Sequence, residues 1–172
     1  MNVILLLLLQ MDNINNSVNI NEIFENALQD PSLLSNIDID ELLGTLENSK
    51  NDYLENKTID SVNNEIFEKI KDLELSIITK QQYCDKLIGY RLVDELHELH
   101  KGKHVRWIRI DNAKLTNGGI VVDIKFMDKG IQVLCRNSTN KFIQYKYDEC
   151  ITFQKLNETE QVIMMAYSYA NK

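Results

Sequence analysis

The three histidines of the chain, His97, His100 and His104, lie close together and raise the question of metal binding. On a helix, side chains three or four positions apart share a face, and imidazole is a common zinc ligand. However, Lys101 and Lys103 lie in the same stretch and would repel a divalent cation, and no cysteine or carboxylate is placed as an obvious fourth ligand. The pattern therefore favours a surface cluster near a helix C-terminus. We expect no bound metal and no other cofactor.

The same stretch places basic side chains on both sides of Trp107. Cations interleaved with an aromatic ring suit a nucleic-acid strand, because they attract its phosphates while its bases can stack. They would also attract an acidic protein surface, which we favour because the whole chain carries a net charge of −7. We predict a partner-binding basic patch formed by Lys101, Lys103, His104, Arg106 and Arg109, which the outward residues Lys125, Arg136 and Lys146 could extend.

Charge is distributed unevenly along the chain. Residues 1–100 carry 7 Lys or Arg against 19 Asp or Glu, a balance of −12, whereas residues 101–172 carry 12 against 7, a balance of +5. Each half attracts opposite charge within roughly a Debye length, ~8 Å at physiological salt. The two halves therefore either attract each other or attract separate partners, and the sequence leaves both interpretations open.

The sequence contains none of the usual patterns of a catalytic site. We find no Gly-rich phosphate loop, no nucleophile elbow and no cysteine–histidine pairing with an orienting acid. The cysteines Cys84, Cys135 and Cys150 are odd in number and lie far apart in apolar stretches. This usage argues against a secreted disulfide framework and indicates a reducing compartment. We expect a protein that is not an enzyme.

An apolar run opens the chain. Residues 3–9 are all apolar, but a transmembrane helix needs ~20 such residues. The basic region and the small-residue cleavage site of a signal peptide are also missing. Either Met11 is the true start, or the run contacts an apolar groove of a partner or a membrane surface. For the partner case we predict an apolar anchor formed by Leu5, Leu6, Leu7, Leu8 and Leu9.

Helices are expected on both sides of the basic stretch. Residues 1–20 have the composition of an apolar, Asn-rich arm, and residues 21–100 that of a helical region. Within this region the apolar spacing predicts helices at 59–77 and 80–99, the second opened by a capping box at Thr79. A second capping box, Asn157 to Glu160, predicts a C-terminal helix within residues 157–172, with Val162, Met165 and Tyr169 on one face.

Between residues 101 and 156 the apolar period changes from 3.6 to 2, which is typical of strands with one buried face. A first strand at 104–110 is followed by a long loop, two tight hairpins and a single-turn link, the arrangement of a five-stranded SH3-like antiparallel β-barrel. The expected fold class is α+β: an acidic helical N-terminal half, this barrel, and a C-terminal helix. The side chains expected inside the barrel are Ile120, Val122, Ile124, Phe126, Ile131, Val133, Cys135, Ile143, Tyr145, Tyr147, Ile151 and Phe153.

The barrel segment also resembles a family of small uncharacterised proteins of giant double-stranded DNA viruses. The resemblance is carried by HKGKHVRWIR from His100, LTNGGIV from Leu115, FIQYKYDEC from Phe142 and FQKL from Phe153, about a third of the chain. It implies a protein made in the host cytoplasm and packaged in the virion. It implies no activity and assigns no functional residue.

These observations lead to one functional prediction and one alternative. The prediction is a non-enzymatic structural or interaction protein, a virion component such as a minor capsid protein that bridges neighbouring viral structural proteins. The alternative is a nucleic-acid-binding small-barrel protein in viral transcription or genome packaging. The expected location is the virion, with the host cytoplasm during assembly.

Overall fold

The computed structural model describes residues 49–170. It divides the chain into two units, residues 1–59 with 157–172, and residues 60–156, and we treat each by itself. The predicted arm, the helices expected before residue 48 and the predicted anchor of Leu5, Leu6, Leu7, Leu8 and Leu9 lie outside the described residues.

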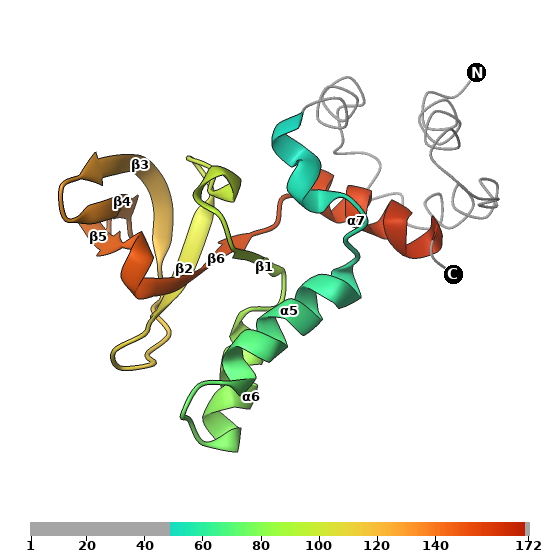
Figure 1. Ribbon diagram of the computed structural model, residues 1–172, viewed down its shortest axis with the longest axis horizontal. Helices are drawn as coiled ribbons and strands as arrows, with labels where there is room; N and C mark the ends of the chain where they lie inside the picture. Colours follow the sequence, from blue (N-terminus) through green and yellow to red (C-terminus); the bar gives the residue numbers. More distant parts are fainter. Residues whose placement is uncertain (1–48, 171–172) are drawn as a thin grey trace. The chain divides into compact units, whose positions relative to one another are not determined.

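A six-stranded antiparallel sheet dominates the unit of residues 60–156 (Figure 1). Its order is β1-β6-β2-β3-β4-β5, so the last of the described strands, β6, lies between the first two of them. The α+β class is confirmed, because helices precede the sheet in this unit. The strands are β1 (Tyr90–Val93), β2 (His104–Arg109), β3 (Gly119–Met127), β4 (Gly130–Arg136), β5 (Phe142–Lys146) and β6 (Cys150–Lys155).

The predicted five-stranded barrel is wrong in strand number and in closure. The five expected strands correspond to β2–β6, with the single-turn link present as the 3-10 helix η3 (Tyr147–Glu149). The sixth strand, β1, pairs with β6, for example Leu92 with Phe153. Because β6 also pairs with β2, both of its edges are used. The strands β1 and β5 are left as two edges that do not pair, and the sheet is open.

The two tight turns form where the sequence predicts them. Met127 pairs with Gly130 across the first turn, and Gly130 takes a φ of +108°, which residues with a side chain rarely adopt. In the second turn the Asn137 side-chain oxygen accepts hydrogen bonds from Thr139 N–H (3.0 Å) and Lys141 N–H (2.9 Å). Both turns are specified by residues within the turn itself: a glycine in the first and an asparagine side chain in the second.

The predicted inward face of β3 is wrong at Ile120 and Val122, which are exposed, whereas Val121 is buried. Phe126 is also exposed, but it lies two positions after the inward Ile124 and so keeps the predicted side, at the end of the strand. The register between β3 and β4 shifts between Val121 and Asp123. Such a bulge adds one residue to one strand and so changes which side chains face the core. On the neighbouring strands the predicted inward residues Val133, Cys135, Tyr145 and Phe153 are buried.

Two helices, α5 (Ile59–Lys71) and α6 (Ile77–Lys86), precede the sheet. Val62, Ile66 and Ile70 form the buried stripe of α5 at a spacing of four residues. The predicted helix over 80–99 is wrong, because α6 ends at Lys86 and β1 begins at Tyr90. Its predicted cap is also wrong: the Oγ of Ser76, not Thr79, caps the helix by accepting the Thr79 N–H. A hydrogen bond from the Tyr83 hydroxyl to Ala113 O (3.1 Å) joins α6 to the loop after β2.

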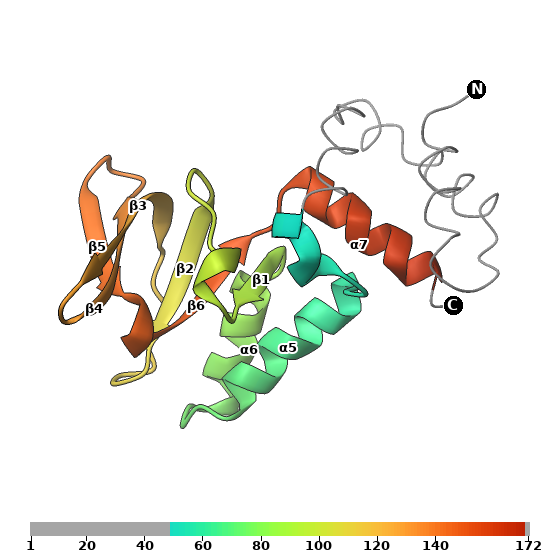
Figure 2. The ribbon, with the colours of Figure 1, turned by 45° about the horizontal axis from the view of Figure 1, so that its top comes forward.

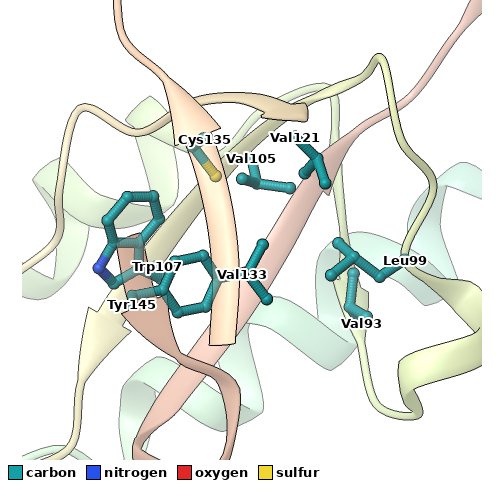
Figure 3. Packing of buried hydrophobic residues seen from close by; sticks show 8 residues of the cluster. All are labelled: Val93, Leu99, Val105, Trp107, Val121, Val133, Cys135 and Tyr145. Atoms are coloured by element: carbon teal, nitrogen blue, oxygen red, sulfur yellow. The ribbon is translucent and has the colours of Figure 1, made fainter. Parts of the chain in front are cut away.

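The core of the sheet centres on Trp107 and Tyr145, whose rings stack at a centroid distance of 4.2 Å and an interplanar angle of 16° (Figure 3). Both side chains are buried, and Thr152 Oγ1 donates to the Tyr145 hydroxyl. The cluster draws on both edge strands, which shows that the open sheet curves around it. Its buried members are Val93, Leu99, Val105, Trp107, Val121, Val133, Cys135 and Tyr145.

The other unit contains the 3-10 helix η1 (Ser49–Leu54) and helix α7 (Glu158–Ala170). The predicted capping box is confirmed: Glu160 N–H donates to the Asn157 side chain (2.7 Å), and Asn157 N–H donates to the Glu160 carboxylate (2.8 Å). The Tyr53 hydroxyl donates to the same buried carboxylate. The predicted inward face of α7 is displaced, because Ile163 and Met164 are buried while Val162 and Met165 are half-buried.

Candidate interaction surface

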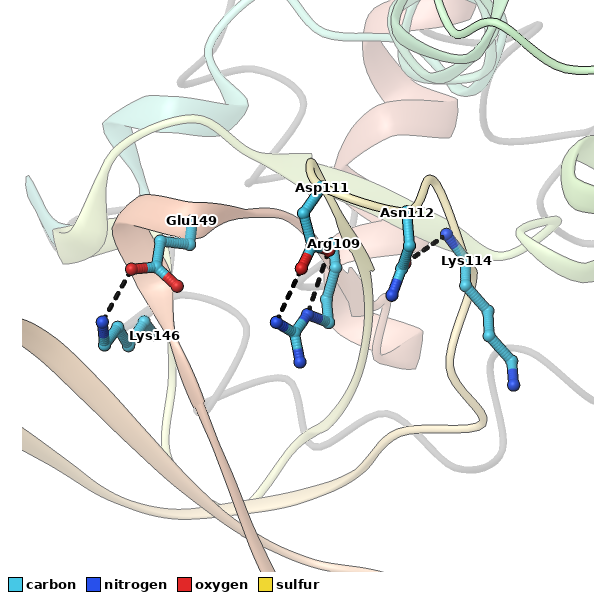
Figure 4. A network of polar contacts seen from close by, with 6 residues as sticks. All are labelled: Arg109, Asp111, Asn112, Lys114, Lys146 and Glu149. Carbon is cyan, nitrogen blue, oxygen red and sulfur yellow. Dashed lines mark hydrogen bonds and ion pairs between the residues drawn. The ribbon is translucent and has the colours of Figure 1, made fainter.

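The residues of the predicted basic patch alternate with core residues along β2, and several of them already have partners within the chain. Within β2 the side chains alternate, and Val105 and Trp107 point into the core between the charged positions. At one end of the segment, Lys101 Nζ lies 2.6 Å from Asp123 Oδ1. At the other end, Arg109 makes two hydrogen bonds to the Asp111 carboxylate, at 2.8 and 3.2 Å (Figure 4). Because Lys101 and Arg109 are paired with carboxylates of the same chain, they attract an external partner less strongly than unpaired cations would.

His104 and Arg106 are held by Tyr90 of β1. The Tyr90 hydroxyl lies 3.1 Å from His104 Nδ1, and the Arg106 guanidinium lies 5.6 Å from the centre of the Tyr90 ring. Burial, followed by the nearby charges of Arg106 and Lys155, lowers the pKa of His104. His104 is therefore neutral at pH 7 and adds no cation to the segment. Lys103, the fifth predicted residue, is half-buried just before β2.

The three histidines do not form a metal site. His97 lies in the 3-10 helix η2 (Leu96–Glu98), with Nδ1 3.2 Å from Glu95 Oε2. The backbone of His100 is held by the buried Gln154 side chain, which accepts the His100 N–H (2.9 Å) and donates to its carbonyl (2.8 Å). Within residues 49–170, no three His, Cys, Asp or Glu side chains come together as metal ligands would.

The cysteine thiols are held in their neutral form. Burial raises the pKa of Cys135 to about 12 and that of Cys150 to about 11, and it also raises the pKa of Cys84. The thiolate is the reactive form, so a raised pKa makes a thiol unreactive at neutral pH. These cysteines have the environment of packing residues rather than of nucleophiles.

We expect the folded protein to react slowly with a thiol reagent such as DTNB at pH 7, and quickly once urea unfolds it. Reaction of the folded protein should accelerate as the pH rises above about 9, because the thiolate fraction then grows. Neutral thiols stabilise the fold fully below their unfolded pKa of roughly 8.5. That contribution is lost as the pH rises through the folded values. Rapid labelling of Cys135 at pH 7 would contradict this assignment.

The strands β3–β5 expose five large apolar side chains. Phe126, Met127 and Phe142 have exposed fractions of 77%, 60% and 65%, and Ile120 and Val122 are also exposed. We call these five residues the meander surface. Ile120 and Phe142 lie at one end of β4, whereas Phe126 and Met127 lie at its other end, beside the first turn. Ile120 pairs with Arg136, which pairs with Phe142, so these three side chains form one row on the outer face of three neighbouring strands.

The sequence pattern does not predict this surface, for two separate reasons. The run Ile120-Val121-Val122 is apolar throughout, so alternation alone did not show which side chain faces the core. Phe142 could have been found, because it precedes Ile143, which was correctly placed among the core residues. Residues adjacent in a strand point to opposite faces.

Cations without an ion-pair partner also lie on these three strands and their turns. Between Ile124 and Lys146 the chain carries five Lys or Arg and one Asp, a net charge of +4. Lys146 pairs with Glu149 at 2.7 Å (Figure 4). Within the described part of the chain, Arg136 and Lys141 are exposed and form no ion pair. Positive charge without an ion-pair partner thus lies beside Phe142 in the meander surface.

Comparison with known proteins adds no relative: no family model, no curated protein and no solved structure matches the chain. Among the described helices, none is long and apolar enough to span a membrane.

Proposed function

We propose that the chain is a non-enzymatic interaction protein that binds another protein through the meander surface. The observation that carries the proposal is the exposure of large apolar side chains at both ends of the three paired strands β3, β4 and β5. Single exposed apolar residues are ordinary on a protein surface, but several on adjoining strands are typical of a binding surface. Aromatic side chains and methionine are also enriched where proteins meet.

Following the resemblance described above, we further propose that the partner is a viral structural protein and that the chain is a virion component, such as a minor capsid protein. The nucleic-acid alternative depends on the segment from Lys101 to Arg109. The ion pairs of Lys101 and Arg109, together with the lowered pKa of His104, weaken the support for that alternative.

The test is affinity isolation of the tagged full chain from its native cells, with quantitative mass spectrometry of the proteins bound and of purified particles. We expect a defined protein partner to be retained by the wild type and lost from the double variant Phe126→Ser/Phe142→Ser. Both side chains are largely exposed, so the variant should keep its melting temperature within a few degrees.

The matched control is Ile77→Ser/Ile78→Ser, which removes two exposed apolar side chains at the start of α6. This control should retain the partner. Equal retention by both double variants would show that the meander surface is not the binding site. Retention of nucleic acid that falls steeply with salt, without a protein partner, would favour the alternative function.

A further inference from the structure

The strand β5 ends the sheet on one side. It pairs with β4 through five residue pairs, from Arg136 with Phe142 to Gln132 with Lys146, and with no other described strand. In both ribbon views it lies at the outer border of the sheet (Figures 1 and 2). An edge strand presents a row of backbone N–H and C=O groups that can pair with another extended chain.

The hydrogen-bond pattern identifies the residues whose backbone faces outward. Asn137 N–H donates to Lys141 O (2.9 Å), so this pair is hydrogen-bonded. In an antiparallel ladder, bonded and non-bonded pairs alternate. Ile143 and Tyr145 therefore direct their backbone groups at β4, whereas Phe142, Gln144 and Lys146 direct theirs away from the sheet.

The surroundings of this edge define the chemistry of the partner. Arg136 and Lys141 are exposed and form no ion pair within the described residues, and Phe142, which follows Lys141 and pairs with Arg136, presents an exposed ring. The segment from Ile124 to Lys146 has a net charge of +4, although the chain as a whole carries −7. Such a surface attracts negative charge.

The alternating donors and acceptors of the edge favour a peptide over a nucleic-acid strand. An extended peptide offers matching N–H and C=O groups, whereas outward carbonyl oxygens would repel phosphates. The opposite edge of the sheet differs, because Tyr90, Arg91 and Val93 of β1 are buried.

From these observations we propose that β5 pairs with an extended, acidic segment of a partner protein, which adds a seventh strand to the sheet. Its carboxylates would lie against Arg136 and Lys141, and an apolar side chain would pack on Phe142. This inference rests on the proposed function, since it specifies how part of the meander surface binds a protein. A Lys-bearing edge can instead serve to keep other strands away, and the experiment separates these two roles.

The test measures binding of the full chain to fluorescent peptides by anisotropy and by amide hydrogen exchange. The probes are a peptide of about ten alternating glutamate and valine residues, the same peptide with serine for glutamate, and an oligothymidylate of about ten nucleotides. We expect the acidic peptide to bind most tightly, and its affinity to fall with added salt. On binding, the amides of Phe142, Gln144 and Lys146 should become protected, while those of Ile143 and Tyr145 should be protected already.

Two variants and one control sharpen the result. Arg136→Glu/Lys141→Glu should weaken binding of the acidic peptide by roughly an order of magnitude. The control variant, Lys69→Glu/Lys86→Glu, makes the same change in net charge on α5 and α6. It should leave the affinity for the acidic peptide unchanged. Gln144→Pro removes one outward N–H without breaking a hydrogen bond to β4. This variant should abolish binding of the acidic peptide. Gln144→Ala, which keeps the N–H, should not.

Three other results of these binding experiments would each overturn the inference. Binding of the acidic peptide without protection at Phe142, Gln144 and Lys146 would show simple charge attraction. Tighter binding of the oligothymidylate would assign the cations to nucleic acid. Failure of all probes to bind, with the partner still lost from the Phe126→Ser/Phe142→Ser variant, would overturn strand addition while leaving the proposed function intact.

Discussion

Replacing Gly118 by alanine should abolish folding of the sheet. Gly118 precedes β3 and has a φ of +74°, and a Cβ built there would lie 1.7 Å from the Val105 carbonyl oxygen of β2. The obstructing atom is backbone, so no side-chain rotation relieves the clash. Separating the two segments would break the pairing of Val105 with Gly119. We expect a loss of more than about 4 kcal/mol, which is exceptional for one substitution and a large part of the stability of a small domain.

The matched control is Gly102→Ala. Gly102 has a similar φ of +83°, but no atom lies within 4 Å of the position of its Cβ. This variant suffers only the backbone strain, about 1–2 kcal/mol, and keeps the N–H that donates to Val121 O. Urea unfolding followed by circular dichroism compares the two. Equal losses would show that the segment at Gly118 can move away from β2 at little cost.

The parts of the fold that the sequence predicts correctly are those determined by neighbouring residues. The hairpin at Gly130 and the turn at Asn137 depend on residues within a few positions of each turn. The capping box of Asn157 and Glu160 is equally local, and it is present with both of its hydrogen bonds. In each case the interaction lies within about one turn of chain, so its partners can be identified from spacing alone.

The strand β1 was missed because its partner is distant. Tyr90 pairs with Lys155, and nothing near Tyr90 in the sequence indicates this contact. The apolar residues from Tyr83 to Leu99 also fit a helical spacing, which led to the incorrect prediction of a helix over 80–99. Tertiary pairing overrode that local pattern. The buried polar contact between Arg91 and Gln154 (3.3 Å) depends on the same pairing and could not be predicted without it.

The contacts of the predicted basic patch could not be predicted from the sequence for the same reason. The lysines and arginines of the segment are identified correctly as cations, but their partners depend on the fold. Lys101 reaches Asp123 in β3, and Arg106 lies over Tyr90 of β1. Sequence proximity therefore overestimated the charge available to a partner there. Arg136 and Lys141 form no ion pair among the described residues, and only the register of β4 and β5 places Arg136 beside Phe142.

Replacing Trp107 by alanine should cost about 3–5 kcal/mol of unfolding free energy, the range for losing a large buried aromatic side chain. Trp107 is 5% exposed and stacks on Tyr145, whose ring would lose its partner and border a cavity. The backbone of Trp107 is also fixed, because Thr116 N–H donates to its carbonyl (2.9 Å) and Thr116 Oγ1 accepts its N–H (3.2 Å). These bonds hinder β2 from collapsing into the space, so relaxation should recover little of the loss.

Unfolding of this variant must be followed by circular dichroism, because Trp107 is the only tryptophan of the chain. The matched control is Phe142→Ala, which removes an exposed aromatic ring from the same sheet and should change stability by no more than about 0.5 kcal/mol. A loss below about 1 kcal/mol for Trp107→Ala would show that the ring contributes little to the core. Binding of a partner would then be the better explanation of Trp107. The stack with Tyr145 would no longer account for the curvature of the open sheet.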